Sequence, residues 1–416
     1  MAKLNELKKE ISKMEALERE LHLKQLQINR LLNITQAINN NVSDQGLYDM
    51  YNSFLSWEMG INKMALYVQS GEDWTCVSYI GVTEKLTKLN ISSELASYQR
   101  LRVLEDNRDH ELIGQFDVVV PVLHKEHPIA YTFIGGFDEN EDMYNKVQFI
   151  TTITNIVAVA IENKRLFKQQ LEQERYNREM ELASDMQHLL IPDFLPKSKH
   201  YQLDSIYKPH QSVGGDYFDY VEFDDGKLIF CIADIAGKGL AAALLMANFQ
   251  ANFHSLLQKR APLDEFVRAL NTSLFRITKG DKHLTFFIGE YDTETNTLIY
   301  CNAGHNPPVI FSQNKLDTLR EGCTILGSFP EIPFMDLGKV EMKEDTTILT
   351  FTDGLTDMQS DAEDYFDEEV LMDFVKDKND LSAQRFNQTL ISQLETFKGR
   401  QNYPDDFTVL TCKFFV

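Results

Sequence analysis

Cysteine is scarce in this sequence, with five residues in a chain of 416. The number is odd, no two cysteines form a Cys-x-x-Cys pair, and most lie in apolar runs typical of strands. Disulfide frameworks and structural zinc sites are built from paired or closely spaced cysteines. We therefore expect the reduced core thiols of a cytosolic protein, and neither disulfides nor zinc ligands, at Cys76, Cys231, Cys301, Cys323 and Cys412.

Long hydrophobic runs are also missing. The longest is "ITNIVAVAI" at 153–161, which is less than half of the roughly 20 residues that a membrane-spanning helix needs. The N-terminal segment "MAKLNELKKEISKMEALERE" has no apolar core of a signal peptide. We expect a cytoplasmic protein without direct membrane insertion, which would reach a membrane only through a partner.

Basic residues are outnumbered, with 41 Lys and Arg against 63 Asp and Glu and a formal net charge of −22. This balance disfavours nucleic acid and anionic membranes as main partners, because phosphate groups attract a basic surface. It also makes a cation-binding site worth seeking. The turn "GKGL" lacks the spacing of a phosphate-binding P-loop, and the absence of a Gly-x-Ser-x-Gly elbow leaves covalent hydrolysis without support.

The chain is long enough for two or three folded domains, and 43% of its residues are hydrophobic. Residues 4–32 carry an apolar heptad pattern, interrupted by Glu18 and Gln25, and predict a coiled-coil segment at 1–32. Four heptads favour a coiled coil and hence a homodimer; the alternative is one amphipathic helix packed on its own domain. The apolar positions of the heptads are Leu4, Leu7, Ile11, Met14, Leu21, Ile28 and Leu32.

Residues 33–165 predict a mixed α+β domain. A helical pattern ends at Gly60, two strands follow around a glycine turn, and a second hairpin surrounds "HKEHP". A helix is expected from about Asn145 to Arg165. This order of elements resembles a GAF domain, which implies a ligand sensor. A ligand-free structural or dimerising domain is an equal alternative, because no cyclic-nucleotide motif is present and Cys76 lies within a strand.

Residues 166–192 predict a long charged helix that links two folded domains. Its apolar residues follow two registers, and the five-residue step from Leu171 to Tyr176 breaks the phase between them. A helix pair with two competing registers can act as a two-state element, because rotation changes which apolar face is buried. We expect this helix to end before Pro192 and to control activity by rotation, with a passive spacer as the alternative.

From residue 193 onward, carboxylates recur beside apolar strands and tight turns. They lie in "VGGDYFDY" at 213–220, after the strand in "GKLIFCIADIAGKG", after "TTILTFTDG" and in "YPDDFT". Hard divalent cations need several oxygen ligands, and adjacent strand ends can bring these together from distant parts of a chain. The pattern therefore predicts a metal site. The segment "NAGHNPP" predicts a tight turn, in which His305 stabilises the turn rather than acting as a base.

Taken in order, "VGGDYFD", "ADIAGKG", "NAGHNPP", "TDGLTD" and "DDFT" resemble the successive motifs of PPM-type (type 2C) protein serine/threonine phosphatases. The resemblance covers roughly residues 195–416 and is greatest to the bacterial sporulation and stress-response branch. It implies a domain at 193–416 with a central β-sandwich flanked by helices and two manganese or magnesium ions at one end. The chain as a whole is then α+β.

The resemblance also assigns roles to single residues. Asp216 matches the first metal ligand, and Asp234 matches the acid that bridges both metals. Ile235 would offer its backbone carbonyl. Asp353 matches the acid of the "DG" motif, and Asp405 matches the first acid of "DDFT".

Two further acids, Asp219 and Asp406, are expected to support the ligands or the fold. Eukaryotic members of the family hold the substrate phosphate with an arginine just upstream of the first acid. Here "YKPHQS" has no arginine, so Lys208 or His210 would have to substitute. The sequence leaves the phosphate-binding residue open.

The implied activity is hydrolysis of phosphoserine or phosphothreonine by a metal-bridged hydroxide, without a protein nucleophile. In this branch of the family the usual substrates are STAS-type anti-sigma-factor antagonists. The alternative is a signalling scaffold with a catalytically degenerate phosphatase domain, and the presence of all four expected acids argues against it. A third possibility, a nucleotide-processing metal enzyme, finds no base-recognition motif.

Overall fold

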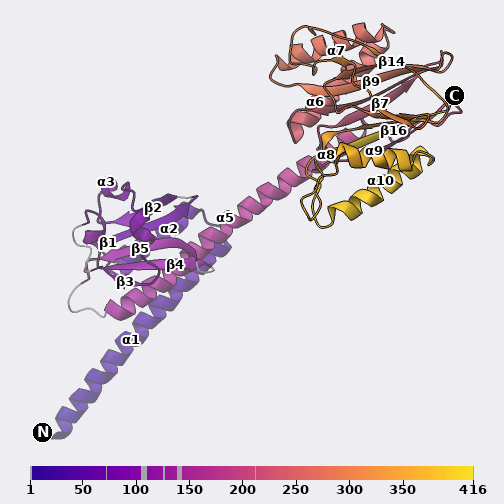
Figure 1. Cartoon of the computed structure of the whole chain (residues 1–416). Helices are drawn as coiled ribbons and strands as arrows, with labels where there is room; N and C mark the ends of the chain where they lie inside the picture. The colour runs from indigo at the N-terminus through magenta and orange to yellow at the C-terminus, as the bar shows by residue number, and fades with distance from the viewer. Residues whose placement is uncertain are drawn as a thin grey trace. The chain divides into compact units, whose positions relative to one another are not determined.

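The computed structural model describes residues 2–71, 73–104, 110–124, 127–137, 143–210 and 212–415. The chain divides into two compact units, Met1–Gln173 and Glu174–Val416 (Figure 1). Each unit has its own hydrophobic core. Helix α5 (Met143–His188) contributes residues to both units. Within the described residues, every helix is too short or too polar to span a bilayer.

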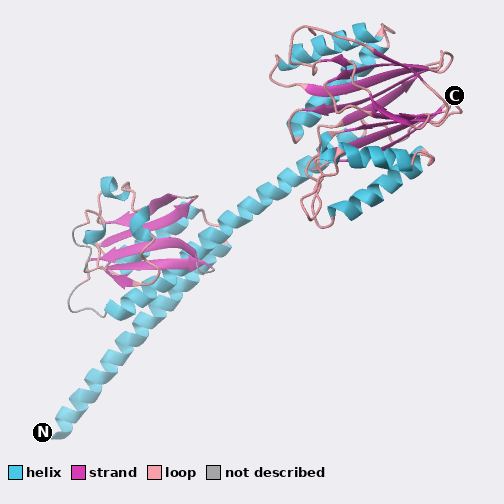
Figure 2. Ribbon diagram, in the orientation of Figure 1, coloured by secondary structure: helices cyan, strands magenta, loops and turns pink. Residues whose placement is uncertain are grey.

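The N-terminal unit is built on one antiparallel sheet (Figure 2). The strand order of this sheet is β2-β1-β5-β4-β3. Its strands are β1 (Lys63–Ser70), β2 (Asp73–Ile80), β3 (Arg102–Val103), β4 (Val118–His124) and β5 (His127–Gly135). Its other helices are α1 (Ala2–Asn39), α2 (Asp44–Ser53), α3 (Glu84–Thr87) and α4 (Ser92–Leu95), with a π-helical turn at Phe54–Glu58 and a 3-10 turn at Ile113–Gln115. The two predicted hairpins are confirmed, and the helical segment ends before Gly60, where φ is +63°.

The sheet of the N-terminal unit is covered on both faces, because successive side chains of a strand point to opposite sides. On one face Leu66 packs with Tyr51 of α2 and Ile153 of α5. On the other face Tyr67 packs in a second cluster, rich in aromatic rings. The buried Tyr51 hydroxyl is 2.6 Å from Thr154 Oγ1, so a hydrogen bond joins α2 to α5 within this core. The resemblance of this unit to a GAF domain stays a prediction.

The C-terminal unit contains two mainly antiparallel sheets. One has the order β13-β10-β9-β8-β7 with β14 also paired to β10, and the other has the order β12-β11-β15-β16-β6. The strands are β6 (Tyr201–Lys208), β7 (Tyr217–Glu222), β8 (Lys227–Ile235), β9 (Leu284–Asp292), β10 (Thr297–Ala303), β11 (Val309–Ser312), β12 (Lys315–Thr318), β13 (Gly322–Cys323), β14 (Gly338–Glu341), β15 (Thr346–Phe351) and β16 (Phe407–Phe414). The helices are α6 (Leu240–Leu257), α7 (Leu263–Thr278), α8 (Asp353–Thr356), α9 (Glu368–Asp377) and α10 (Ala383–Lys398).

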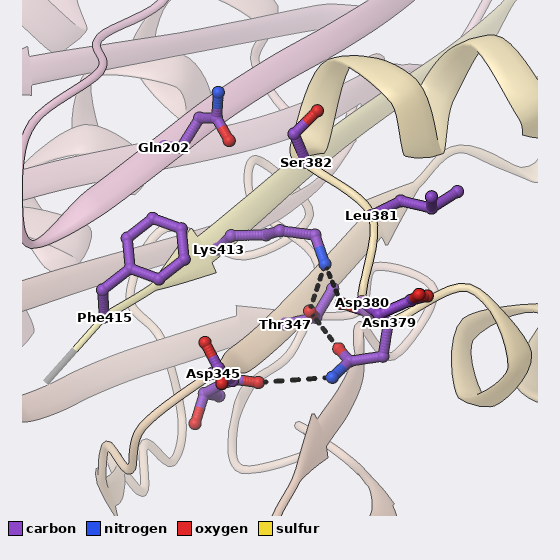
Figure 3. Close-up of a pocket in the computed structure, with 10 residues that line it drawn as sticks. Gln202, Asp345, Thr347, Asn379, Asp380, Leu381, Ser382, Lys413 and Phe415 are labelled. Atoms are coloured by element: carbon purple, nitrogen blue, oxygen red, sulfur yellow. Dashed lines mark hydrogen bonds between the residues drawn. The ribbon is translucent and has the colours of Figure 1, made fainter.

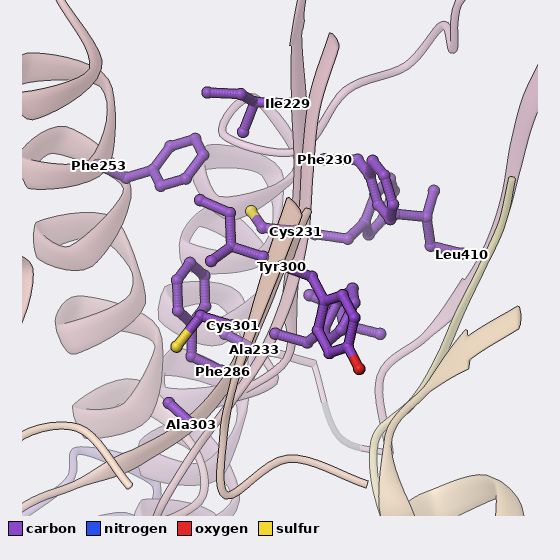
Figure 4. Close-up of a cluster of buried hydrophobic side chains, with 14 of the residues drawn as sticks. Ile229, Phe230, Cys231, Ala233, Phe253, Phe286, Tyr300, Cys301, Ala303 and Leu410 are labelled. Carbon is purple, nitrogen blue, oxygen red and sulfur yellow. The ribbon is translucent and has the colours of Figure 1, made fainter. Parts of the chain in front are cut away.

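The two sheets pack face to face. The Phe414 ring of β16 lies 6.1 Å from the ring of Phe230 on β8, and Leu410 joins the same core (Figure 4). The outer face of the first sheet is covered by α6 and α7, where Phe253 packs against Phe286. A further core lies under α9 and α10, on the outer face of the second sheet. The predicted β-sandwich flanked by helices is confirmed.

Four of the five cysteines are buried, as expected of core residues, and Cys76 is half-buried. Cys231 stands next to Phe230 on β8, and their side chains point to opposite faces of the strand (Figure 4). The sulfur atoms of Cys301 and Cys323 are 3.9 Å apart as free thiols. Cysteine therefore contributes to packing in the sandwich.

Candidate active site

The four predicted acids come from four separate segments of the C-terminal unit. Asp216 directly precedes β7, and Asp234 is the penultimate residue of β8. Asp353 is the first residue of α8, two positions after β15, whereas the sequence predicted it at the strand end itself. Asp405 lies two positions before β16. β7 and β8 belong to one sheet and β15 and β16 to the other, so the acids converge from both layers of the sandwich.

Asp216 and Asp234 are close enough to repel each other. Asp216 is 1% exposed, and burial followed by the charge of Asp234 raises its pKa well above the usual range. Burial raises the pKa of Asp234 to about 7, with further contributions from the charges of Asp353, Asp405 and Asp406. The hydroxyl of Thr352 donates to Asp216 Oδ2 at 2.7 Å and fixes that carboxylate.

Asp353 and Asp405 belong to the same electrostatic group. Partial burial, then the charges of Asp357 and Asp405, raise the pKa of Asp353. Lys238 acts in the opposite direction on Asp353 and Asp234, and its Nζ lies 2.7 Å from Asp405 Oδ2. The structure thus links the four predicted acids electrostatically through Asp234, with one lysine beside Asp405.

The glycine pair of "VGGDYFDY" allows two close approaches beside Asp216. A Cβ on Gly214 would lie 2.7 Å from Oδ2 of Asp406, and a Cβ on Gly215 would lie 2.7 Å from the carbonyl oxygen of Ile235. The N–H of Gly215 donates to the same Asp406 oxygen at 2.6 Å. Glycine is required here because any side chain would separate the segment from these oxygens.

The two supporting acids have different roles. Asp406 accepts from the backbone N–H of Gly215 and, at 2.8 Å, from that of His210, and so holds the loop before Asp216. Asp219 is 5% exposed and accepts from the Tyr217 hydroxyl and, at 2.7 Å, from Nε2 of His254 on α6. Asp219 therefore ties β7 to α6 and takes no part in the group of four acids.

His305 has the environment of a turn residue. Its N–H donates to Asn302 Oδ1 at 2.8 Å, and its ring Nδ1 is 2.8 Å from Thr285 Oγ1. Gly304 before it has φ of +70°, which a turn between β10 and β11 requires. Burial lowers the pKa of His305 to about 4, so the ring is neutral near neutral pH. The predicted turn is confirmed.

The two residues considered for phosphate binding are engaged elsewhere. Lys208 pairs with Glu395 and with the Tyr403 hydroxyl, at 3.2 Å in both cases. The ring of His210 bonds the Tyr403 carbonyl at 2.7 Å. Lys238, by contrast, lies among the acids, and its side chain is 54% exposed. The sequence indicated Lys238 only as part of a weak "GKG" phosphate loop. The signal that could have identified it is its position four residues after Asp234, in the same motif.

A cavity of about 470 Å³ lies elsewhere in the C-terminal unit, and none of the four acids lines it (Figure 3). Its walls include Gln202, Thr347 and Asn379, with the 4%-exposed Lys413 directed toward the last two. Lys413 donates to Thr347 Oγ1 at 3.1 Å and to the Asn379 carbonyl, and burial lowers its pKa to about 8. The candidate active site is therefore the end of the β-sandwich where the four aspartates lie, and this cavity is not part of it.

The donor set of the acidic site fits hard divalent cations. Within the described part of the chain, no three His, Cys, Asp or Glu side chains are grouped closely enough to hold an ion by themselves. Magnesium-like ions retain several waters and need only one or two carboxylates each from the protein. The four carboxylates, three of which repel that of Asp234, together with the Ile235 carbonyl supply oxygen ligands of that kind, and a cation would offset the repulsion.

The C-terminal unit is similar in sequence to known proteins. Residues 224–415 match the family model "Stage II sporulation protein E (SpoIIE)". The chain is 23% identical over 275 residues to "Phosphoserine phosphatase RsbU" of Bacillus subtilis (strain 168), which covers 66% of this chain and 80% of that protein. It is 26% identical over 239 residues to "Protein IcfG" of Synechocystis sp., which covers 50% of this chain but only 37% of that protein.

Structural comparison agrees with this result. The SiaA-PP2C domain of Pseudomonas aeruginosa superposes with a TM-score of 0.52 at 19% identity, covering 58% of this chain and 98% of that domain. The C-terminal unit therefore has the α+β fold of a PP2C domain, and its sequence is similar to the SpoIIE family and to RsbU. The family match begins after Asp216 and includes Asp234, Asp353 and Asp405.

Proposed function

We propose that this protein is a regulated, metal-dependent phosphatase that hydrolyses phosphoserine or phosphothreonine in proteins. The observation that carries the proposal is the electrostatic group of four aspartates from two sheets, in which the pKa of Asp234 rises to about 7. Relatives named phosphoserine phosphatase, RsbU and RsbP, support the same activity. We assign the metal ligands as Asp216, Asp234, Asp353, Asp405 and the carbonyl of Ile235, for two Mn²⁺ or Mg²⁺ ions.

When bound, such ions lower the pKa of water and neutralise charge on phosphoryl oxygens. The protein's own residues orient this chemistry. Thr352 fixes the Asp216 carboxylate, and Asp406 holds the N–H of Gly215 beside it. Burial lowers the pKa of His305 to about 4, so its ring is a weak base, and we assign His305 to the turn and not to proton transfer.

We further assign Lys238 as the residue that holds the substrate phosphate. Its Nζ lies beside Asp405, its side chain is half-exposed, and its charge acts on Asp234 and Asp353. A flexible ammonium group in this position can turn from a carboxylate to a phosphate oxygen, because both are anionic acceptors. It would replace the missing upstream arginine.

The proposed substrate is a phosphorylated STAS-type anti-sigma-factor antagonist in the cytoplasm, and the proposed enzyme is a homodimer. The heptad residues whose side chains are described support dimerisation, since Ile11, Met14, Leu21, Ile28 and Leu32 are all exposed in the single chain. Exposed apolar residues at heptad spacing are buried when two helices pair. Control would come from the N-terminal GAF-like unit through α5.

The test is hydrolysis of p-nitrophenyl phosphate and of a phosphoserine protein by the purified full chain. We expect activity that depends on Mn²⁺ and disappears with a chelator. Lys238→Ala should raise KM for the phosphoprotein with a smaller effect on kcat, since it holds the ground-state phosphate. A chain that binds the phosphoprotein but never hydrolyses it with any divalent metal would be a scaffold and not an enzyme.

A further inference from the structure

A buried lysine lines the cavity that lies apart from the acidic site (Figure 3). Lys413 is the penultimate residue of β16 and is 4% exposed. Its ammonium group donates to Thr347 Oγ1 at 3.1 Å and to the carbonyl oxygen of Asn379, and both acceptors are neutral. Among the described residues, none of its hydrogen bonds goes to a carboxylate. A buried cation normally has an anionic partner, because an ion pair offsets the loss of its water shell.

Two aspartates line the same cavity without hydrogen-bonding to Lys413. They are Asp345 and Asp380, and both are exposed. Burial lowers the pKa of Lys413 to about 8, against the opposing charges of the two aspartates. The ammonium group therefore keeps its charge near neutral pH. The cavity has one buried positive charge and two exposed negative charges in its wall.

The rest of the wall has room and contacts for a small ligand. An ammonium group has three N–H donors, and two acceptors take those of Lys413 within the described residues. Leu381 and Phe415 add apolar surface. The volume of about 470 Å³ lies within the range of small-molecule sites, which is ~300–1,000 Å³. An anionic group in the cavity could accept from the third donor and pair with the buried charge.

We propose that this cavity binds a small zwitterion of the amino-acid class. Its carboxylate accepts from Lys413, its ammonium group pairs with Asp345 or Asp380, and an apolar side chain lies against Leu381 and Phe415. A phosphate would bring two negative charges toward the aspartates, and a simple amine would leave Lys413 unpaired. None of the four aspartates of the acidic site lines the cavity, so the proposal is independent of the phosphatase activity.

The test measures binding of the protein L-amino acids, one at a time, to the purified full chain by saturation-transfer difference NMR. Titration of the signal gives the dissociation constant. Two analogues of the amino acid that binds most tightly are compared with it, one without the ammonium group and one without the carboxylate. Inorganic phosphate is added as a competitor. We expect an apolar amino acid such as leucine to bind, and both analogues to bind at least about tenfold more weakly.

Two variants test the assignment of the charges. Lys413→Met keeps an unbranched side chain but removes the charge, and it should weaken amino-acid binding about tenfold or more. Asp380→Asn removes an exposed charge and should weaken binding about threefold. The controls are Lys376→Met and Asp373→Asn at exposed positions of α9 that do not line the cavity, and both should match wild type.

A double variant decides the question if Lys413→Met does not fold. Asp345→Asn combined with Asp380→Asn changes only exposed side chains, and asparagine tolerates the backbone of Asp345, where φ is +58°. It should weaken binding more than Asp380→Asn alone.

Three results would overturn the proposal. They are the lack of binding by any amino acid, equal binding by the analogue without the ammonium group, and wild-type affinity in folded Lys413→Met or in the double variant. Displacement of the amino acid by phosphate at a similar concentration would make the cavity a site for simple anions and would equally contradict it.

Discussion

Asp216 and Asp219 lie three residues apart in one motif, are 1% and 5% exposed, and have opposite surroundings. Asp219 is met by the Tyr217 hydroxyl and the His254 ring. Asp216 accepts from Thr352, but the charge that faces it is the carboxylate of Asp234. The comparison teaches that burial alone does not mark a functional acid. A buried acid surrounded by donors holds the fold together, and one that faces other acids calls for a cation.

The strongest test of this comparison is to replace each kind of acid, Asp216 or Asp219, by asparagine. Asp216→Asn, and equally Asp234→Asn, should lower phosphatase activity by more than about 100-fold, because even residues that merely orient metal ligands contribute 10–100-fold. Without metal, Asp234→Asn should be at least as thermally stable as wild type. The pKa of Asp234 is raised in the folded state, so its charge opposes folding at neutral pH and the amide removes that cost.

Asp219→Asn should do the reverse. It weakens the hydrogen bonds to Tyr217 and His254, so the melting temperature should fall while the folded enzyme keeps its turnover. Thermal denaturation and Mn²⁺-dependent turnover of the variants measure both effects. Wild-type turnover in folded Asp234→Asn, or a complete loss in folded Asp219→Asn, would show that the two kinds of acid have been assigned the wrong way round.

The contrast also explains what the sequence could predict. The short acidic motifs and their resemblance to the phosphatase family pointed to the four acids, and "NAGHNPP" predicted the turn at His305, because these depend on local patterns. The salt bridge of Lys238 to Asp405 and the pairing of Gln187 with Gly214 depend on contacts between distant segments. Hydrophobic periodicity points to apolar helix faces and cannot reveal that an amide side chain near the end of α5 is buried.

The fold shows the same division between local and long-range information. The hairpins β1–β2 and β4–β5 were predicted from strand-like runs around a glycine turn and around "HKEHP", which are local signals. The proposed phosphate contacts of Lys208 and His210 were not found, since these side chains turn to Tyr403. Nothing in "YKPHQS" signals a partner nearly two hundred residues away.

A second prediction sharpens the comparison by acting on α5, which contacts the Asp216 loop and not Asp219. One residue inserted near Gln173 should turn the upstream helix by ~100° relative to the downstream part, and four residues should nearly restore it. We expect the single insertion to change activity on a phosphoprotein about tenfold, a typical size for coupling between sites. The four-residue insertion should recover most of it. Equal activity in both insertions and in wild type would make α5 a spacer.

The smallest expected effect is on the pH dependence of stability and concerns His254, the histidine that is hydrogen-bonded to Asp219. This hydrogen bond raises the pKa of His254 above the ordinary 6.5, against a partial offset from burial. A histidine with a raised folded pKa stabilises the fold fully below its unfolded pKa, and that contribution is lost as pH rises through the folded value. The His254 side chain is 41% exposed, so solvent screening should limit the contribution to about 0.5 kcal/mol.

Urea unfolding at about pH 6 and about pH 8.5 should show wild type losing this stability relative to His254→Gln. His283→Gln, at an exposed histidine, is the control and should follow wild type. An identical pH dependence in wild type and His254→Gln would mean that Asp219 is held by its tyrosine and backbone donors alone.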